Sequence, residues 1–332
     1  MIQSSKAARR WRLSATATVA NAAAVLATAA LVAACGGGTS QFEPFIAERV
    51  FAFGDDSSVL LSDGKRYGVN GLVTTTTTST FDCRLEPLWV QNIASYYGFV
   101  FAECNVAVAP ALPAVPKAFM RAAAGAKVAD VAAQVEAQAA AGGLRDKDLA
   151  LVLAGANDVL ALYAQYPAVS EAALIAEAGL RGERMAAVVN RLVSLGAKVI
   201  VSNLPDMGMS PFARAEALAN ASSGFDRAAL ITRLTTAFNE RLGVKVLLDG
   251  RFVGLVQMDL RTQSAARSPS SFGFVDVSTA VCTAALPNCT TATLVTGANA
   301  GAYLWADGTR LASGGQGSLA TLALERAQRN PF

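Results

Sequence analysis

A short apolar run early in the chain ends in residues that could carry chemistry. The stretch Phe51–Ser58 reads FAFGDDSS, so two carboxylates, Asp55 and Asp56, and two hydroxyls, Ser57 and Ser58, follow a glycine. Carboxylate and hydroxyl groups can attack a substrate or carry protons when a suitable base or cation lies beside them. The stretch therefore predicts a sharp turn that presents reactive groups at the end of a buried element.

Other polar groups follow apolar runs in the same way. GAND at 155–158 and NLPDMG at 203–208 come directly after such runs, and DGTR at 307–310 lies near the C-terminus. The chain contains no histidine, so no imidazole can serve as a base or a metal ligand. We expect neither a metal nor a cofactor.

Apolar segments of strand length alternate with longer helical patterns. Continuous apolar runs without polar alternation indicate a parallel sheet covered by helices on both faces, whose ligands gather at the carboxyl ends of the strands. Trp89–Phe99 reads as a helix packed on the sheet, with a lipid-binding face as the alternative, and 73–81 and 110–116 read as surface loops. The predicted strands are 50–54, 98–109, 149–155, 197–203 and 244–249, and the predicted helices include 126–142, 170–195 and 225–242.

These strand-end motifs resemble those of the GDSL esterase/lipase family, the SGNH hydrolases. Gly54-Asp55, GAND, NLPDMG, FGFVDVSTAVC (272–282) and YLWADGTR (303–310) follow the family's order over about 280 residues. The resemblance implies an α/β fold, a three-layer α/β/α sandwich with a mostly parallel five-stranded sheet in flavodoxin-like order. It also implies hydrolysis of acyl esters by a serine after Gly-Asp and an Asp-x-x-His pair.

The residues that would do this chemistry are replaced. Asp56 stands at the nucleophile position and Arg310 at the base position, while Asp307, which would orient the base, is retained. The resemblance places the oxyanion hole at Asn157, which is retained, and at Ala109, where the family has a glycine. Guanidinium remains protonated and cannot take a proton from a nucleophile.

Four interpretations of this site remain open. Ser57 could act as a displaced nucleophile, or the Asp56 carboxylate could itself attack. An ion-pair network of Asp56, Arg310 and Asp307 could replace the triad, or both side chains could point to water. We favour the network, because an arginine between two carboxylates compensates charges that are costly to bury alone.

The function expected from these residues is that of a catalytically dead or weak homologue that binds an acyl ester or a glycan. The alternatives are an active ester hydrolase with rearranged groups and an envelope scaffold without a ligand.

The N-terminus reads as an export signal. Four basic residues precede an apolar stretch at about 15–34, and LVAAC at 31–35 resembles a bacterial lipobox in which Cys35 becomes lipidated. We expect a signal peptide at 1–34, a tether at 35–47 and a single domain at 48–329, anchored in the bacterial envelope, with the outer membrane favoured. An uncleaved anchor or plain secretion are the alternatives.

Removal of the signal changes the charge of the protein. The 28 basic residues fall to 24 against 25 acidic ones, so the mature chain gives no indication of nucleic-acid binding. With Cys35 acylated, an even number of cysteines remains for disulfides in an exported protein. Cys83–Cys104 and Cys282–Cys289 are the simplest of three possible pairings.

Overall fold

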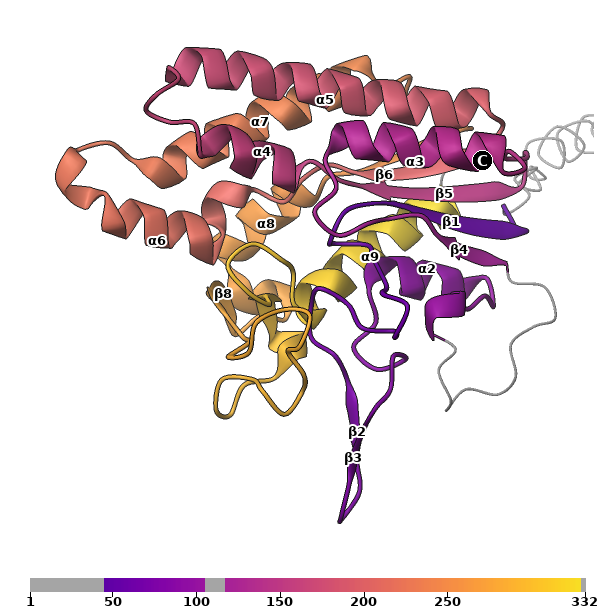
Figure 1. The fold of residues 1–332 in the computed structure, drawn as a ribbon, viewed down its shortest axis with the longest axis horizontal. Helices are drawn as coiled ribbons and strands as arrows, with labels where there is room; N and C mark the ends of the chain where they lie inside the picture. Colours follow the sequence, from indigo (N-terminus) through magenta and orange to yellow (C-terminus); the bar gives the residue numbers. More distant parts are fainter. Residues whose placement is uncertain (1–44, 105–116, 330–332) are drawn as a thin grey trace, which may run out of the picture. The chain divides into compact units, whose positions relative to one another are not determined.

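A sheet of five parallel strands forms the centre of the fold (Figure 1). The computed structural model describes residues 45–104 and 117–329. The strands run in the spatial order β4 (Ala118–Met120), β1 (Arg49–Gly54), β5 (Asp148–Leu153), β6 (Lys198–Ser202) and β7 (Val253–Val256). This is the flavodoxin-like order, in which the second strand of the sheet lies outside the first, so the predicted fold class is confirmed.

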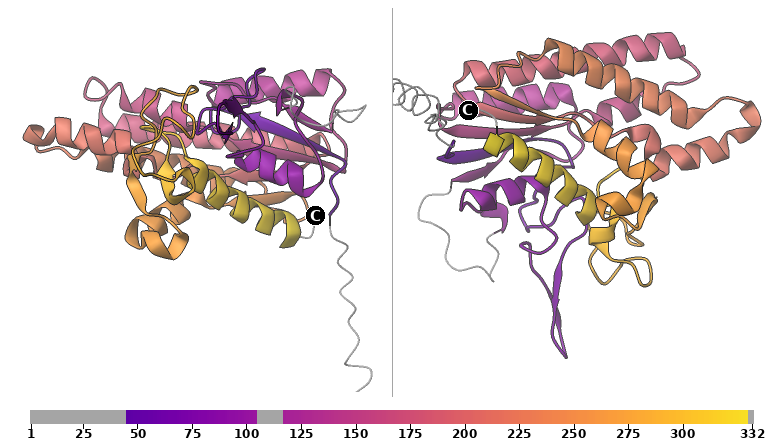
Figure 2. Two further views of the ribbon diagram at one scale, coloured as in Figure 1. Left: turned by 90° about the horizontal axis from the view of Figure 1, so that it is seen from below. Right: turned by 180° about the vertical axis from the view of Figure 1, so that it is seen from behind.

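Helices cover both faces of this sheet. Figures 1 and 2 show α3, α5 and α7 on one face and α2 and α9 on the other. The three layers expected from the apolar runs are therefore present. The helices are α2 (Trp89–Tyr96), α3 (Val128–Ala140), α4 (Ala156–Tyr163), α5 (Glu171–Ser194), α6 (Pro211–Ala219), α7 (Arg227–Lys245), α8 (Met258–Arg267) and α9 (Ser313–Arg329).

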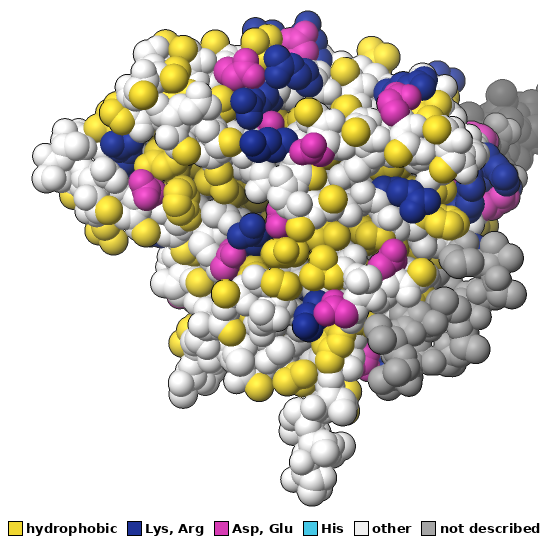
Figure 3. All heavy atoms as spheres, viewed as in Figure 1, with side chains coloured by type: hydrophobic (Ala, Val, Ile, Leu, Met, Phe, Trp, Pro, Cys, Tyr) yellow, Lys and Arg dark blue, Asp and Glu magenta, His cyan; other side chains and the backbone are white. Residues whose placement is uncertain are grey.

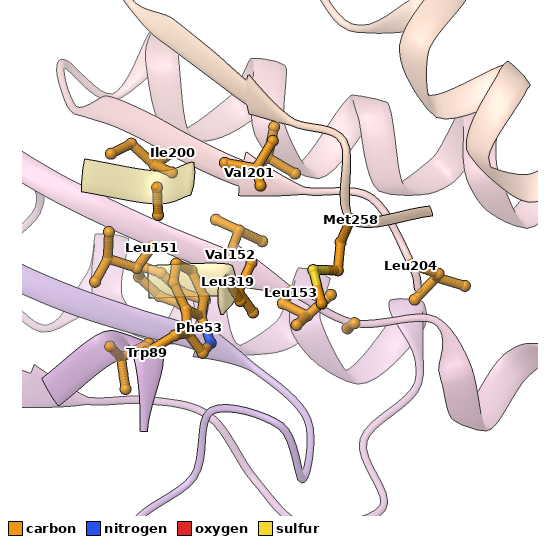
Figure 4. Close-up of a cluster of buried hydrophobic side chains, with 14 of the residues drawn as sticks. Phe53, Trp89, Leu151, Val152, Leu153, Ile200, Val201, Leu204, Met258 and Leu319 are labelled. Atoms are coloured by element: carbon orange, nitrogen blue, oxygen red, sulfur yellow. The ribbon is translucent and has the colours of Figure 1, made fainter. Parts of the chain in front are cut away.

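The core lies between the sheet and its two helical layers. All six residues of β5 are buried, as a central strand with helices on both sides requires. Figure 4 shows Phe53, Leu151 and Ile200 from three adjacent strands, with Trp89 from α2 and Leu319 from α9. Each large apolar side chain buried in this way contributes roughly 1.5–3 kcal/mol, so the strand ends rest on a rigid base.

Two predicted strands are wrong. In the part of 98–109 that the structure describes, Ala102–Cys104 forms a 3-10 helix, and the edge strand is β4. The run 244–249 is not a strand because α7 continues to Lys245, and β7 begins only at Val253. Apolar content alone does not separate a strand from a helix end.

The threonine-rich segment is also more regular than predicted. Instead of an irregular loop, β2 (Leu72–Thr74) and β3 (Ser79–Phe81) form an antiparallel hairpin. Figure 1 shows this hairpin projecting away from the sheet. The segments 1–44 and 105–116, which include the predicted signal, Cys35 and a predicted loop, lie outside the described residues.

Both predicted disulfides are confirmed. Cys83 is bonded to Cys104, and Cys282 to Cys289. Cys289 belongs to a small apolar cluster that includes Ala306. The backbone N–H of Cys282 donates to the carbonyl of Ala306 at 2.9 Å. The second disulfide therefore braces the segment that leads to Asp307.

Candidate functional site

The site begins where β1 ends at Gly54. This residue has φ +140°, and a Cβ atom there would lie 2.1 Å from the carbonyl oxygen of Leu153 on β5. The side-chain amide of Gln134 accepts from the Gly54 N–H and donates to its carbonyl, both at 2.9 Å. The turn therefore has a fixed direction, and it aims the next residues at the carboxyl ends of the strands.

Asp56 is buried and held by three donors. Its Oδ2 accepts from the backbone N–H of Gly125 at 3.0 Å and from Asn157 Nδ2 at 2.9 Å. Its Oδ1 lies 3.4 Å from Arg310 Nη2, which is long for a hydrogen bond but within ion-pair range. Asp56 is only 4% exposed, so these donors replace the water that a buried carboxylate loses.

Arg310 lies between two carboxylates. Its Nη1 donates to Asp307 Oδ2 at 3.0 Å, in addition to the ion pair with Asp56. Burial by itself lowers the pKa of Arg310, but the charges of Asp307 and Asp56 outweigh burial and raise the pKa above its ordinary value. The Asp56–Arg310–Asp307 network expected from the sequence is present, and neither charged side chain at positions 56 and 310 simply faces water.

A tight turn fixes the position of Asp307. Its Oδ1 accepts from the backbone N–H of Thr309 at 2.8 Å and of Arg310 at 2.7 Å. The carbonyl of Gly308 accepts from the N–H of Phe212 at 2.9 Å, which ties the turn to α6. Asp307 therefore keeps the orientation that a residue positioning a base would need, although its partner is a guanidinium.

Asn157 is positioned by the start of α4. The preceding Gly155 has φ +124°, and a Cβ there would meet the ring of Phe238 at 2.4 Å, so only glycine fits. Asn157 Nδ2 also donates to the carbonyl of Ala126 at 3.0 Å. These contacts aim the Asn157 amide at Asp56.

Gly125 was not predicted as a site residue. It lies just before α3, has φ +72°, and donates its N–H to the same Asp56 oxygen as Asn157 does. The sequence interpretation had placed the glycine position of the oxyanion hole at Ala109, which lies outside the described residues. Gly125 directly precedes the predicted helix at 126–142, but that position alone does not mark its backbone N–H as part of the site.

Asp56 Oδ2 thus occupies a position suited to an oxyanion. A backbone N–H and an asparagine amide converge on one point, which is the arrangement that stabilises negative charge on an oxygen during acyl transfer. Here the converging donors bind an oxygen of the chain itself. A substrate oxygen could use them only by displacing the Asp56 carboxylate.

Ser57 contacts its neighbours through its backbone. Its backbone N–H donates to Asp55 Oδ1 at 2.9 Å, and its carbonyl accepts from Gln316 Nε2 at 3.3 Å. Ser58 is fully buried, and its Oγ accepts from Trp89 Nε1 at 3.1 Å. Both serines are engaged in holding the turn.

Asp55 is buried beside Asp56. Burial is the main reason that the pKa of Asp55 rises to about 7, and the neighbouring charge of Asp56 adds to the rise. Hydrogen bonds from Ser57 act in the opposite direction but do not outweigh burial. Asp55 therefore stays protonated in the folded protein up to about neutral pH.

We expect Asp55→Asn to remove a pH dependence of stability. In the unfolded chain Asp55 ionises near its ordinary pKa of 3.8, and in the folded chain near 7. Its stabilising contribution is therefore complete below pH 3.8 and is lost as pH rises towards 7. Urea unfolding measures the free energy of unfolding at pH 4 and pH 8. From pH 4 to pH 8, this free energy should rise in the variant relative to the wild type by on the order of 3 kcal/mol.

Asp276→Asn is the matched control, because the contribution of Asp276 to stability changes with pH in the opposite direction. Burial would raise the pKa of Asp276, but hydrogen bonds from Thr279 and Ser278 hold it below the ordinary value. Its contribution is present above that ordinary value and is lost as pH falls, so this variant should lose stability relative to the wild type at pH 8. A difference between Asp55→Asn and the wild type that stays constant from pH 4 to pH 8 would contradict the assignment.

The polar residues after β6, Asn203 and Asp206, have a structural role. Asn203 Oδ1 accepts from the backbone N–H of Met258 at 2.7 Å, at the start of α8. Asp206 accepts from the N–H of Gly208 at 3.1 Å and from Thr232 Oγ1 at 2.9 Å. Asp206 is therefore a capping residue and takes no part in the site.

Among residues 45–104 and 117–329, no group of three or more His, Cys, Asp or Glu side chains is arranged to hold a metal ion. Within the same residues, no helix combines the length and the apolar character needed to cross a bilayer.

No protein-family model matches this chain, and no curated protein matches it. It is similar to a solved lipolytic protein of the G-D-S-L family from Veillonella parvula, at 11% identity and a TM-score of 0.41, over 83% of this chain and 96% of that one. A lipase from a goat rumen metagenome matches at 13% identity and 0.42, over 84% and 96%. The acetyl xylan esterase AlAXEase matches at 12% identity and 0.42, over 83% and 98%.

The first of these carries the name of the family that the strand-end motifs resemble. At such low identities a similar fold does not say which reaction a site performs. The function has to be argued from Asp56, Arg310 and their partners.

Proposed function

We propose that this chain is a non-catalytic relative of the SGNH ester hydrolases, exported to the bacterial envelope and held there by lipid on Cys35. One observation carries the proposal. Asp56 Oδ2 accepts from Gly125 and Asn157 while Oδ1 faces Arg310, so a carboxylate fills the place where acyl chemistry would occur.

Asp56 is a poor nucleophile in this setting. A carboxylate that accepts two hydrogen bonds and pairs with a guanidinium has its negative charge stabilised, and attack would forfeit that stabilisation. An ester formed on Asp56 would also need a base to activate water. Arg310, whose pKa is raised, cannot supply one, and the chain has no histidine.

Of the two expected ligands, these contacts favour a glycan over an acyl ester. The carbonyl oxygen of an ester would compete with Asp56 for the donors of Gly125 and Asn157. The partly exposed side chains of Arg310 and Asp307 can instead exchange hydrogen bonds with sugar hydroxyls. The ring of Tyr67, 5.6 Å from the Arg310 guanidinium, offers an apolar face beside them.

The purified chain is expected to be inert toward a short-chain activated ester and a fluorophosphonate. Turnover should equal that of Asp56→Ala, and intact-mass measurement should find no phosphonyl adduct. Asn157→Ala serves as the matched control, because it removes a donor of the site without touching a carboxylate. Wild-type turnover that disappears in Asp56→Ala would establish the alternative, an ester hydrolase with rearranged groups.

A further inference from the structure

Large apolar side chains gather at the amino ends of the strands, opposite the candidate site. Val244, Leu247 and Leu248 are 75%, 69% and 54% exposed; Val244 lies in the last turn of α7, and the two leucines follow the end of that helix. Ile46, 72% exposed, lies three residues before β1, at the same edge of the sheet. Single exposed apolar residues are common on proteins, but a cluster of this kind marks a contact surface.

This surface, which we call the apolar edge (Val244, Leu247 and Leu248), is held in place by the fold. Asn190 Nδ2 donates to the carbonyl of Lys245 at 3.1 Å, and Asn190 Oδ1 accepts from the N–H of Leu247 at 2.9 Å. A side chain of α5 therefore fixes the segment after α7. The exposed leucines belong to a built turn and not to a frayed helix end.

Basic side chains surround the apolar edge. Lys245 and Arg251 flank it, and Arg145 and Lys147 are exposed where β5 begins. Lys245, Arg251 and Lys147 are also paired with acidic side chains, so their attraction to anions is reduced. The acidic partners are Glu183, Asp249 and Glu48. Figure 3 shows basic and acidic side chains among apolar ones at the end of the molecule where β1 and β5 start.

The chain itself indicates what lies against this edge. The described residues begin at Phe45, four residues before β1, so the polypeptide enters at the same edge as Val244–Leu248. Nine residues separate Cys35 from Phe45. Their extended reach is at most about 30 Å, so lipid on Cys35 would keep this edge close to the bilayer.

We propose that the apolar edge lies against the membrane surface, with Leu247 and Leu248 inserted at the level of the lipid headgroups. That the partner of the apolar edge is a membrane rests on the proposed lipid anchor at Cys35. Apolar side chains flanked by lysine and arginine suit an interface containing anionic phospholipid. In this orientation the carboxyl ends of the strands, with Asp56 and Arg310, face away from the bilayer.

Tryptophan reporters test the orientation. Leu247→Trp and Leu218→Trp are compared in the lipidated chain from Cys35 onward, which lacks Trp11, bound to phosphatidylcholine–phosphatidylglycerol vesicles with brominated acyl chains. Leu218 is the matched control because it is 80% exposed on α6, which follows β6 on the site side of the sheet. The native Trp89 and Trp305 are buried and add a constant background. The fraction of the introduced tryptophan fluorescence that the brominated lipid quenches should be about twofold or more larger at position 247 than at position 218.

A second variant tests the neighbouring side chains. Adding Val244→Ser and Leu248→Ser to the Leu247→Trp chain should remove about half of that quenching, because less apolar surface is available for insertion. Equal quenching at positions 247 and 218 would overturn the proposal. So would sedimentation of vesicle-free wild type as a dimer that the two serine changes dissociate, because the edge would then bind a second copy.

The anchor and the edge can fail separately. Binding to vesicles that depends on Cys35 but leaves both reporters equally quenched keeps the anchor and overturns the edge. Selective quenching at position 247 that persists in the Cys35→Ala chain supports the edge and counts against the anchor. A chain that does not sediment with the vesicles at all overturns both.

Discussion

Asp56→Ser combined with Arg310→His is expected to produce ester hydrolysis at least about 100-fold above the wild-type rate. The remaining parts of the site are in place for it. Gly125 and Asn157 already direct two N–H groups at one point beside position 56. Asp307 Oδ2, 3.0 Å from Arg310 Nη1, would become available to orient an imidazole. A hydroxyl and a base within reach of these groups supply what the chain lacks.

The measurement is turnover of a short-chain activated ester together with fluorophosphonate labelling. The adduct should map by peptide mass spectrometry to position 56 of the double variant. Each single variant should stay near background, since a serine without a base and a base without a nucleophile are both inactive. Adding Asn157→Ala to the double variant should reduce its rate by about 10²–10³-fold.

A folded double variant that acquires no fluorophosphonate label would contradict the roles assigned to Gly125, Asn157 and Asp307. Native near-ultraviolet circular dichroism establishes that the protein is folded. Equal activity in Asp56→Ser alone would also contradict it, because a base other than residue 310 would then be acting.

Gly54→Ala is expected to destabilise the protein by at least about 3 kcal/mol. The new Cβ would lie 2.1 Å from the Leu153 carbonyl oxygen, and the backbone would have to keep φ at +140°. Relief would require β1 to move away from β5, which breaks the register between the two central strands. The hydrogen bonds from Gln134 to both backbone groups of Gly54 would be lost with it.

Urea unfolding followed by circular dichroism measures this effect. Gly243→Ala is the matched control, because it lies in α7 with no atom within 4 Å of the added methyl group. It should change stability by no more than about 1 kcal/mol, in the stabilising direction. An unfolding midpoint for Gly54→Ala equal to that of the wild type would show that the turn tolerates a side chain.

Much of the sheet could be predicted because its central strands are uniformly apolar. The run at 149–155 corresponds to β5, where helices on both faces bury every side chain. The run at 244–249 looked the same, but Val244 belongs to the end of α7, and Leu247 and Leu248 are exposed after it. Periodicity reports apolar content and not which neighbours cover it, so the two cases could not be separated from the sequence.

Some residues of the candidate site could be predicted from the sequence and others could not. Asp56, Arg310 and Asp307 could be brought together from the sequence because the resemblance to the SGNH hydrolases assigns positions to these side chains. Gly125 could not, because it contributes a backbone N–H, and every residue except proline has one. Only the path of the chain after β4 shows that this N–H points at Asp56.

The double role of Asp307 bears on the order in which the two unusual residues can be acquired. A guanidinium at position 310 has Asp307 as a partner whatever stands at position 56. A carboxylate at position 56 is buried beside Asp55, and among the described residues the cation paired with it is Arg310. A lineage can therefore accept the arginine first at little cost, whereas accepting the aspartate first passes through an uncompensated buried charge. Under the proposed relationship to the SGNH hydrolases, this geometry favours replacement of the base before replacement of the nucleophile.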